Sequence, residues 1–297
     1  MKIDLTGTGV ALVTPFREDT SPDYDGLRRL VRHVADGGVD YLVVLGTTAE
    51  TATLSPEEKT RIMEVVAGEN AGRLPLVVGI GGNNTLAVAS ELQNRNLDGY
   101  DAILSVSPYY NRPTQEGIYR HFEYLAQRAP LPVIVYNVPS RTGSNMLPET
   151  VARLAADCPN IIGVKEACGE MGQIRDLIGR VPGDFLVISG DDTTAVPTIL
   201  AGGAGVISVL GQAVPAGFTA MIHAALEGRA EEARSMSATL DPLVELIFRE
   251  GNPAGVKALL QREGVCGSQV RLPLVRATAA LRENLDAFMR QLPAEKA

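Results

Sequence analysis

The chain is poor in the residues that bind metals and form disulfides. Its 297 residues include three cysteines, three histidines and no tryptophan. Cys158, Cys168 and Cys266 form no CxxC pair and are odd in number, so we expect reduced thiols rather than a zinc site or a disulfide framework. The histidines have no partner at the spacing of metal ligands. We therefore expect no metal centre.

Basic blocks and long apolar runs are also missing. The formal net charge is -8 and no Lys/Arg cluster occurs, which disfavours nucleic acid or an anionic membrane as partner and favours a small molecule. Residues 193–226 carry no charge, but prolines and glycines cut them into pieces shorter than the roughly 20 apolar residues a bilayer requires. We expect buried strand and helices there. The N-terminus lacks the apolar core of a signal peptide, so we expect a cytoplasmic protein.

Short β-rich apolar segments alternate with amphipathic ones, a pattern that predicts parallel strands joined by crossover helices. Eight units with no leftover strand predict an α/β fold of the closed (β/α)8 TIM-barrel type, for which about 250 residues suffice. An open doubly wound sheet is the alternative, but Gly79-Ile80-Gly81-Gly82-Asn83-Asn84 lacks the third glycine of the dinucleotide fingerprint. The predicted strands are Gly9–Thr14, Tyr41–Leu45, Leu76–Gly79, Ala102–Val106, Val133–Tyr136, Ile161–Lys165, Phe185–Ser189 and Val206–Val209.

Helices are predicted between the strands and after the last one. Asp25–Asp36 has a one-sided apolar face, and Pro56–Ala67 follows a serine N-cap and carries acids in its first turn. We predict a catalytic barrel over residues 1–228 and a helical extension over 229–297, although no linker composition forces a separate domain. Three helices are expected in that extension, over Ala230–Arg249, Pro253–Arg262 and Leu274–Leu292.

Polar side chains gather where the predicted strands end, which is the active-site face of such barrels. The residues at these positions are Thr14, Gly46-Thr47-Thr48, Ser107 to Tyr110, Tyr136-Asn137, Lys165, Ser189-Gly190 and Ile207-Ser208. Hydroxyl groups and one amine are therefore expected to converge.

Lys165 ends the sixth strand and is one of only five lysines among 27 basic residues. Loss of hydration at the end of a buried strand favours the neutral amine and lowers the pKa of a lysine. A neutral amine beside a carbonyl substrate forms a Schiff base. The alternative is a structural lysine that reaches water or a carboxylate such as Glu166.

One turn and two single residues each have a catalytic and a structural interpretation. The Gly46-Thr47-Thr48 turn offers backbone amides for a carboxylate, but such turns occur in ordinary loops. Tyr136 could pass a proton during imine formation or be a core tyrosine. Arg141 suits bidentate carboxylate binding or simply faces water.

Two pairs remain open as well. Tyr109-Tyr110 could form an interface patch, and in Asp191-Asp192 we interpret Asp192 as a helix cap rather than a ligand.

Five blocks, in this order, resemble the dihydrodipicolinate synthase family of pyruvate-dependent Schiff-base lyases, which includes N-acetylneuraminate lyase. The similarity runs from about Gly9 to Leu274. The blocks are Gly46-Thr47-Thr48-Ala49-Glu50, Ser107 to Gln115, Tyr136 to Gly143, Ile162 to Ala167 and Ser189-Gly190-Asp191-Asp192.

The resemblance implies a role for each matching residue. Lys165 would form the imine with pyruvate, and the turn with Thr48 would hold the pyruvate carboxylate. Tyr136, Thr47 and Tyr110 would form a proton relay, with Tyr110 reaching in from the neighbouring subunit. The substrate-binding set is implied to be Thr48, Arg141, Gly190 and Ile207.

The implied reaction joins pyruvate to aspartate semialdehyde without an external cofactor, in diaminopimelate and lysine synthesis. Arg141 would bind the semialdehyde carboxylate, and the family is typically a homotetramer, a dimer of dimers. The alternative is an aldolase of the same family that acts on a 2-keto-3-deoxy sugar acid or a hydroxy-oxoglutarate.

The chain departs from the family pattern at several positions. Ala49 replaces a glycine, which matters if that position needs a positive φ. Where lysine-inhibited relatives carry histidines and a glutamate, this chain has Pro56, Lys59 and Ala87. We expect lysine feedback to be weak or absent, because a carboxylate that would pair with the effector's ammonium group is lost.

Overall fold

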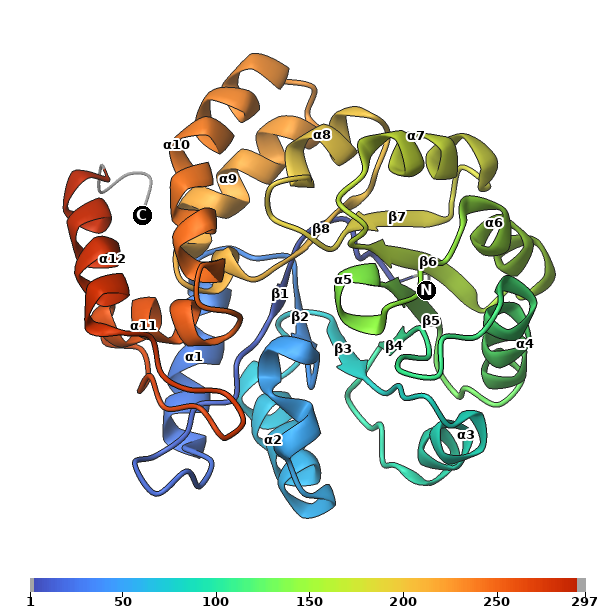
Figure 1. The fold of residues 1–297 in the computed structure, drawn as a ribbon, viewed down its shortest axis with the longest axis horizontal. Helices are drawn as coiled ribbons and strands as arrows, with labels where there is room; N and C mark the ends of the chain where they lie inside the picture. The colour runs from blue at the N-terminus through green and yellow to red at the C-terminus, as the bar shows by residue number, and fades with distance from the viewer. Residues whose placement is uncertain (1–2, 293–297) are drawn as a thin grey trace.

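Eight parallel strands close into a barrel in the order β1 to β8 in the computed structural model, which describes residues 3–292 (Figure 1). The predicted (β/α)8 fold is confirmed. The strands are β1 Gly7–Ala11, β2 Tyr41–Val44, β3 Leu76–Gly79, β4 Ala102–Val106, β5 Val133–Asn137, β6 Ile161–Glu166, β7 Leu186–Ser189 and β8 Gly205–Ser208.

The first strand begins two residues earlier and ends three residues earlier than predicted. Gly7 and Thr8 pair with the start of β8, whereas the amide of Val13 donates to the side chain of Gln212 instead of to a neighbouring strand. Thr14 consequently lies beyond the strand, where its hydroxyl donates to the carbonyl of Ala49.

Helices surround the barrel in the gaps between strands (Figure 1). Ser55 and Glu58 form a capping box at the start of α2, which confirms the predicted helix start. The charge-free stretch after residue 193 forms α8, β8, η3 and α9, as predicted. The elements are α1 Tyr24–Asp36, η1 Thr47–Ala49, η2 Thr51–Thr53, α2 Pro56–Asn70, α3 Thr85–Asn94, α4 Gln115–Ala126, α5 Pro139–Thr142, α6 Pro148–Asp157, α7 Met171–Arg180, α8 Ala195–Leu200, η3 Leu210–Gln212 and α9 Pro215–Leu226.

Side chains that alternate along the strands form two cores. One lies between the strands and the surrounding helices. The other fills the barrel and includes Tyr41, Leu104, Tyr136, Ile188 and Ile207. Alternate residues of each strand therefore point to the barrel axis, where the last ones reach its carboxyl end.

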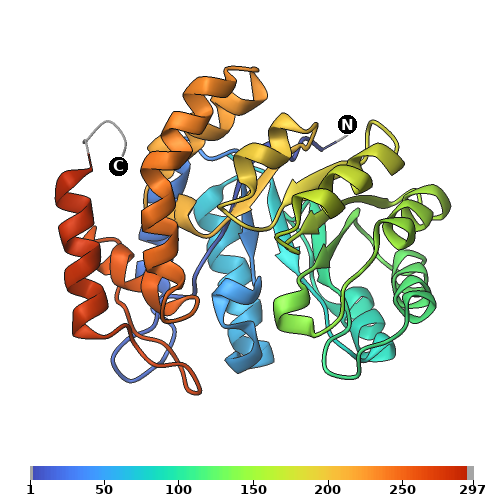
Figure 2. The same ribbon diagram turned by 45° about the horizontal axis from the view of Figure 1, so that its top comes forward.

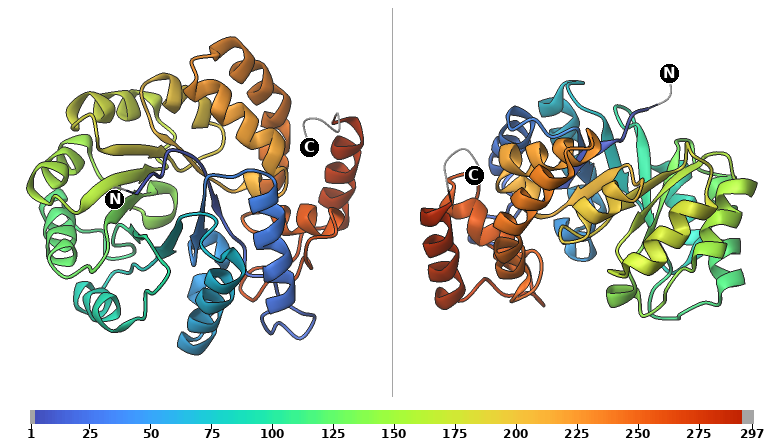
Figure 3. Two further views of the ribbon diagram at one scale, coloured as in Figure 1. Left: turned by 180° about the vertical axis from the view of Figure 1, so that it is seen from behind. Right: turned by 90° about the horizontal axis from the view of Figure 1, so that it is seen from above.

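Three helices follow the barrel on one side, α10 Ala230–Phe248, α11 Ala254–Arg262 and α12 Ala279–Gln291 (Figures 2 and 3). The predicted extension is confirmed, but α12 begins five residues later than expected because Thr278 caps it. The preceding residues run as a loop. The division at residue 228 stays a prediction, and residues 293–297 lie outside the described part. Within residues 3–292, none of the helices is long and apolar enough to cross a membrane.

Candidate active site

A cavity of about 440 Å³ opens at the carboxyl ends of strands β2 to β5. Thr47, Tyr136 and Arg141 of the predicted site line it, together with Asn252 and Leu274 from the C-terminal extension. Residues more than 200 positions apart in the sequence thus share one pocket.

Lys165 lies on β6 beside Tyr136 of β5 and Ile188 of β7. It is 6% exposed, and its Nζ lies 4.5 Å from the centroid of the Tyr136 ring. Burial lowers the pKa of Lys165 to about 8; the Asp192 carboxylate opposes this shift and the charge of Arg141 adds to it. A lysine with this pKa is neutral in about one molecule in ten at pH 7, against roughly one in 2,500 for an exposed lysine.

The structural interpretation of Lys165 was that it reaches water or a carboxylate such as Glu166. The Glu166 carboxylate instead accepts hydrogen bonds from the Asn137 side chain and from the amide of Cys168. Burial raises the pKa of Glu166, and these hydrogen bonds oppose that shift. Successive residues of a strand point to opposite faces. The side chain of Lys165 therefore points into the barrel, and that of Glu166 points away from it.

Gly190, which follows β7, lies directly against Lys165. A Cβ atom at this position would come within 3.1 Å of Cγ and Cε of Lys165 and 2.7 Å of Cβ of Ala167. Any side chain here would therefore displace the lysine. Ile207 of β8 is fully buried in the barrel core.

Tyr136 and Thr47 of the glycine–threonine turn line the same cavity. Burial raises the pKa of Tyr136, and the charge of Arg141 and the polar side chain of Thr47 oppose this shift. A tyrosine that faces an amine and shares a cavity with a threonine is suited to carry protons at that amine.

The turn after β2 is built from two 3₁₀ segments. Its left-handed residues are Leu45, with φ 58°, and Glu50, with φ 55°. Ala49 between them adopts no positive φ, so its methyl group meets no backbone restriction. The hydroxyl of Thr48 accepts a 2.9 Å hydrogen bond from the Asn252 side chain.

Arg141 lies on the short helix α5 at the rim of the cavity. Tyr110 does not join the cavity within this chain. It is 89% exposed and its φ is 72°. Of the predicted residues, Thr47, Tyr136 and Arg141 line the cavity, while Lys165 lies beside Tyr136 and against Gly190. Lys165, Gly190, Thr48, Ile207 and Tyr110 are not among the residues that line the cavity.

One interpretation from the sequence was wrong. Asp192 does not cap a helix that follows it, because α8 begins at Ala195 with no side-chain cap. Its buried carboxylate accepts hydrogen bonds from the amides of Val209 and Leu210, at the end of β8. Burial raises the pKa of Asp192 to about 6, and hydrogen bonds from Ser208 and Leu210 oppose the shift.

No role was predicted for Asn252 or Lys257, nor for Glu50, which belongs to the first of the five family blocks. Asn252 lines the cavity, and Lys257 pairs with Glu50 in a fully buried ion pair. The Asn-Pro dipeptide before α11 marked a chain turn, but no local pattern indicated that these residues reach the turn after β2.

The barrel and the buried amine at the end of its sixth strand fit the class of imine-forming barrel enzymes. The chain belongs to the Dihydrodipicolinate synthetase family, whose sequence model matches residues 4–292.

Curated relatives and solved structures are similar to this chain over nearly its whole length. The chain is 54% identical over 286 residues to the 4-hydroxy-tetrahydrodipicolinate synthase of Flavobacterium psychrophilum, covering 96% of this chain and 98% of that one. It is 49% identical to the same enzyme of Cytophaga hutchinsonii over 93% of this chain and 92% of that one. The structure of dihydrodipicolinate synthase from Thermotoga maritima has a TM-score of 0.94 at 38% identity, covering 96% of this chain and 98% of the other.

Proposed function

We propose that the chain condenses pyruvate with L-aspartate 4-semialdehyde to 4-hydroxy-tetrahydrodipicolinate, a step of diaminopimelate and lysine biosynthesis. The observation that carries this proposal is the buried amine of Lys165, which faces Tyr136 while Arg141 lines the cavity beside it. The relatives at 54% and 49% identity share the synthase name, which favours the synthase over the sugar-acid aldolase.

The first half-reaction uses the neutral amine of Lys165. It attacks the ketone carbon of pyruvate, and a proton delivered through Tyr136 and Thr47 allows the resulting carbinolamine to lose water as the imine forms. The amides of Ala49 and Glu50 donate back to the carbonyls of Gly46 and Thr47. Because these two amides are used within the turn, the pyruvate carboxylate binds the amides of Thr47 and Thr48 in this proposal.

The second half-reaction needs a proton loss from the pyruvate methyl group, which converts the imine to an enamine. The enamine carbon attacks the aldehyde carbon of the second substrate, whose carboxylate binds the guanidinium of Arg141. The amino group of that substrate then attacks the imine carbon, closes the ring and releases Lys165. Gly190 and Ile207 bound the pyruvate end of the pocket, and no cofactor is required.

Tyr110 completes the relay from a neighbouring subunit in this proposal. The exposed ring of Tyr110 and its left-handed backbone fit a side chain that is held out for another chain. The assembly is then a homotetramer, a dimer of dimers, placed in the cytoplasm with its two small substrates.

A coupled assay with both substrates and the downstream reductase tests the reaction, and borohydride reduction in the presence of pyruvate tests the imine. We expect turnover and a mass increase on the peptide that contains Lys165. Trapping without turnover would contradict the synthase, and labelling of another lysine would contradict the role of Lys165. Lys165→Met supplies the matched control.

A further inference from the structure

The turn that carries Thr47 and Thr48 is joined to the C-terminal extension by a buried ion pair. The Nζ atom of Lys257, on α11, lies 2.5 Å from Oε1 of Glu50, and both side chains are at most 1% exposed. Lys257 also donates to the carbonyl of Gln269, and its Nζ lies 4.3 Å from the centroid of the Phe16 ring. Two charges removed from water in this way require each other, because either one alone would be left unpaired.

Glu50 occupies the point in the turn where the backbone is least favourable. It separates η1 from η2 with φ 55° and ψ 35°, a left-handed conformation that a residue with a side chain adopts only when its surroundings hold it. Its amide donates to the carbonyl of Thr47, and its carbonyl accepts from the amide of Thr53. The side chain of Glu50 therefore anchors the residue that sets the direction of the turn.

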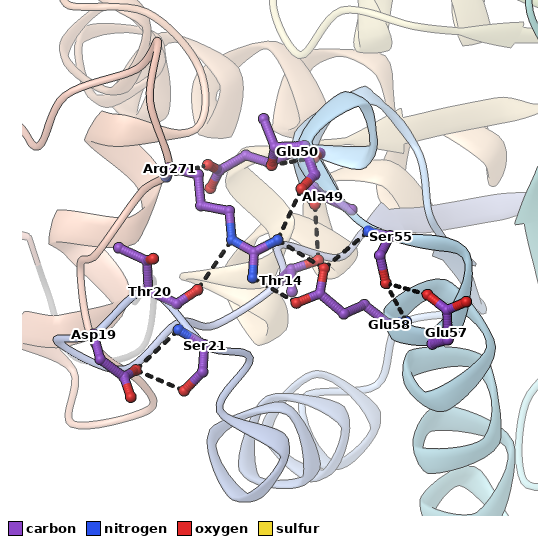
Figure 4. A network of polar contacts seen from close by, with 11 residues as sticks. Thr14, Asp19, Thr20, Ser21, Ala49, Glu50, Ser55, Glu57, Glu58 and Arg271 are labelled. Atoms are coloured by element: carbon purple, nitrogen blue, oxygen red, sulfur yellow. Dashed lines mark hydrogen bonds and ion pairs between the residues drawn. The ribbon is translucent and has the colours of Figure 1, made fainter.

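Further bonds join the same two segments. The amide of Arg271 donates to Oε2 of Glu50 at 2.8 Å, and the guanidinium of Arg271 makes two hydrogen bonds to Glu58 (Figure 4). Asn252 adds the bond to the hydroxyl of Thr48. The carboxylate of Glu50 thus has a donor on each oxygen, and both donors come from the extension.

The same turn lies close to the reacting amine of Lys165. Thr47 and Tyr136 line the same cavity, and the ring of Tyr136 faces the Nζ of Lys165. A shift of the turn would therefore move the proposed carboxylate site and the proton carrier together. A misplacement of about 1 Å at such a site can lower a rate about 100-fold.

We propose that Glu50 and Lys257 are positioning residues, through which the C-terminal extension holds the Thr47-Thr48 turn in register with Lys165. The inference deepens the proposed function, since it assigns the turn to pyruvate. Arg141 lies on α5 and is not attached to the turn. Loss of the ion pair should therefore impair the pyruvate half-reaction and leave binding of the second substrate unchanged.

The test is the double variant Glu50→Gln/Lys257→Met, which removes both charges while nearly preserving volume and so leaves no unpaired buried charge. We expect a folded protein whose kcat/KM for pyruvate and rate of borohydride-trapped imine formation fall by about tenfold or more, with the KM for the semialdehyde within about twofold. The control is Asp286→Asn, which breaks the exposed ion pair between α11 and α12 and should alter none of these values. A folded double variant with pyruvate kinetics like the unmodified protein would overturn the proposal.

Native-state hydrogen exchange keeps the proposal testable if the double variant does not fold. In the unmodified protein, peptides over residues 46–54 and 254–271 should gain deuterium at matching rates, because the tether makes them one cooperative unit. Faster exchange in the turn than in α11 would contradict the tether. This measurement needs no catalysis, so its outcome is separate from failure of the proposed reaction.

Discussion

The Nζ of Lys165 lies 4.5 Å from the centroid of the Tyr136 ring, and the two residues are direct partners in the pairing of β6 with β5. Strand register therefore places the proposed nucleophile and the proposed proton carrier together before any loop is considered. The charge of a protonated Lys165 is favoured by the ring face, whereas burial disfavours it. The lowered pKa of Lys165 shows that burial dominates.

The rate of imine formation should rise with pH through about 8, where Lys165 loses its proton. The Asp192 carboxylate raises the pKa of Lys165, so Asp192→Asn should move the midpoint to lower pH. Single-turnover trapping of pyruvate between pH 6 and 10 measures both midpoints. An unchanged midpoint in the variant would contradict the electrostatic link.

Lys165→Met should stabilise the protein while abolishing activity. The pKa of Lys165 falls from an ordinary value of 10.5 to about 8, which corresponds to a cost of about 3 kcal/mol for keeping the charged amine buried. That cost is fully present below pH 8 and disappears as pH rises from 8 to 10.5, because the unfolded chain binds more protons there. Urea unfolding at pH 7 and pH 10 should show the gain of the variant shrinking at the higher pH. Equal gains at both values would show that packing, not charge, is responsible.

Tyr136→Phe should lower kcat by about 100- to 10,000-fold, the usual contribution of a positioned proton donor or acceptor. The ring that faces Lys165 is retained, so the pKa of the amine should change little by comparison. Tyr41→Phe is the control. Tyr41 is also buried in the barrel, but it is the first residue of β2, where it pairs with Gly9 of β1. A similar loss in both variants would indicate a general defect of the barrel.

Arg141→Ala should raise the KM for the semialdehyde by about 10- to 100-fold, because a charge-assisted hydrogen bond contributes about 1.5–3 kcal/mol. Trapping of pyruvate should proceed as before. Arg141→Lys should restore activity only in part, since an ammonium group lacks the planar fork of a guanidinium. If neither change alters the KM, the second substrate does not bind Arg141 through a carboxylate.

Lysine should inhibit weakly or not at all. Lys59 lines the cavity of the candidate site, while Pro56 and Ala87 line a neighbouring groove between α2 and α3, and none of the three supplies a carboxylate for an ammonium group. Steady-state assays with added lysine measure this directly. Inhibition in the low-millimolar range or below would refute the expectation.

Local sequence patterns were sufficient for most of the architecture. The β-rich segments, the serine cap before α2 and the lysine at the end of the sixth strand each depend on residues close in the chain. The predictions failed mainly at the ends of strands. Val13 has a strand-like sequence, yet its amide turns to Gln212, which lies 199 residues away.

The sequence by itself determined the eight-stranded barrel, the place of Lys165 on it and the threonine turn that follows the second strand, because hydrophobic periodicity and turn residues act over short distances. Only the tertiary structure decided that Asn137 and Gln173 bind Glu166, that Asp192 caps the end of β8, and that Lys257 holds Glu50. The last pair is separated by 207 residues. Its formation depends on mutual burial of two charges, which no local pattern encodes.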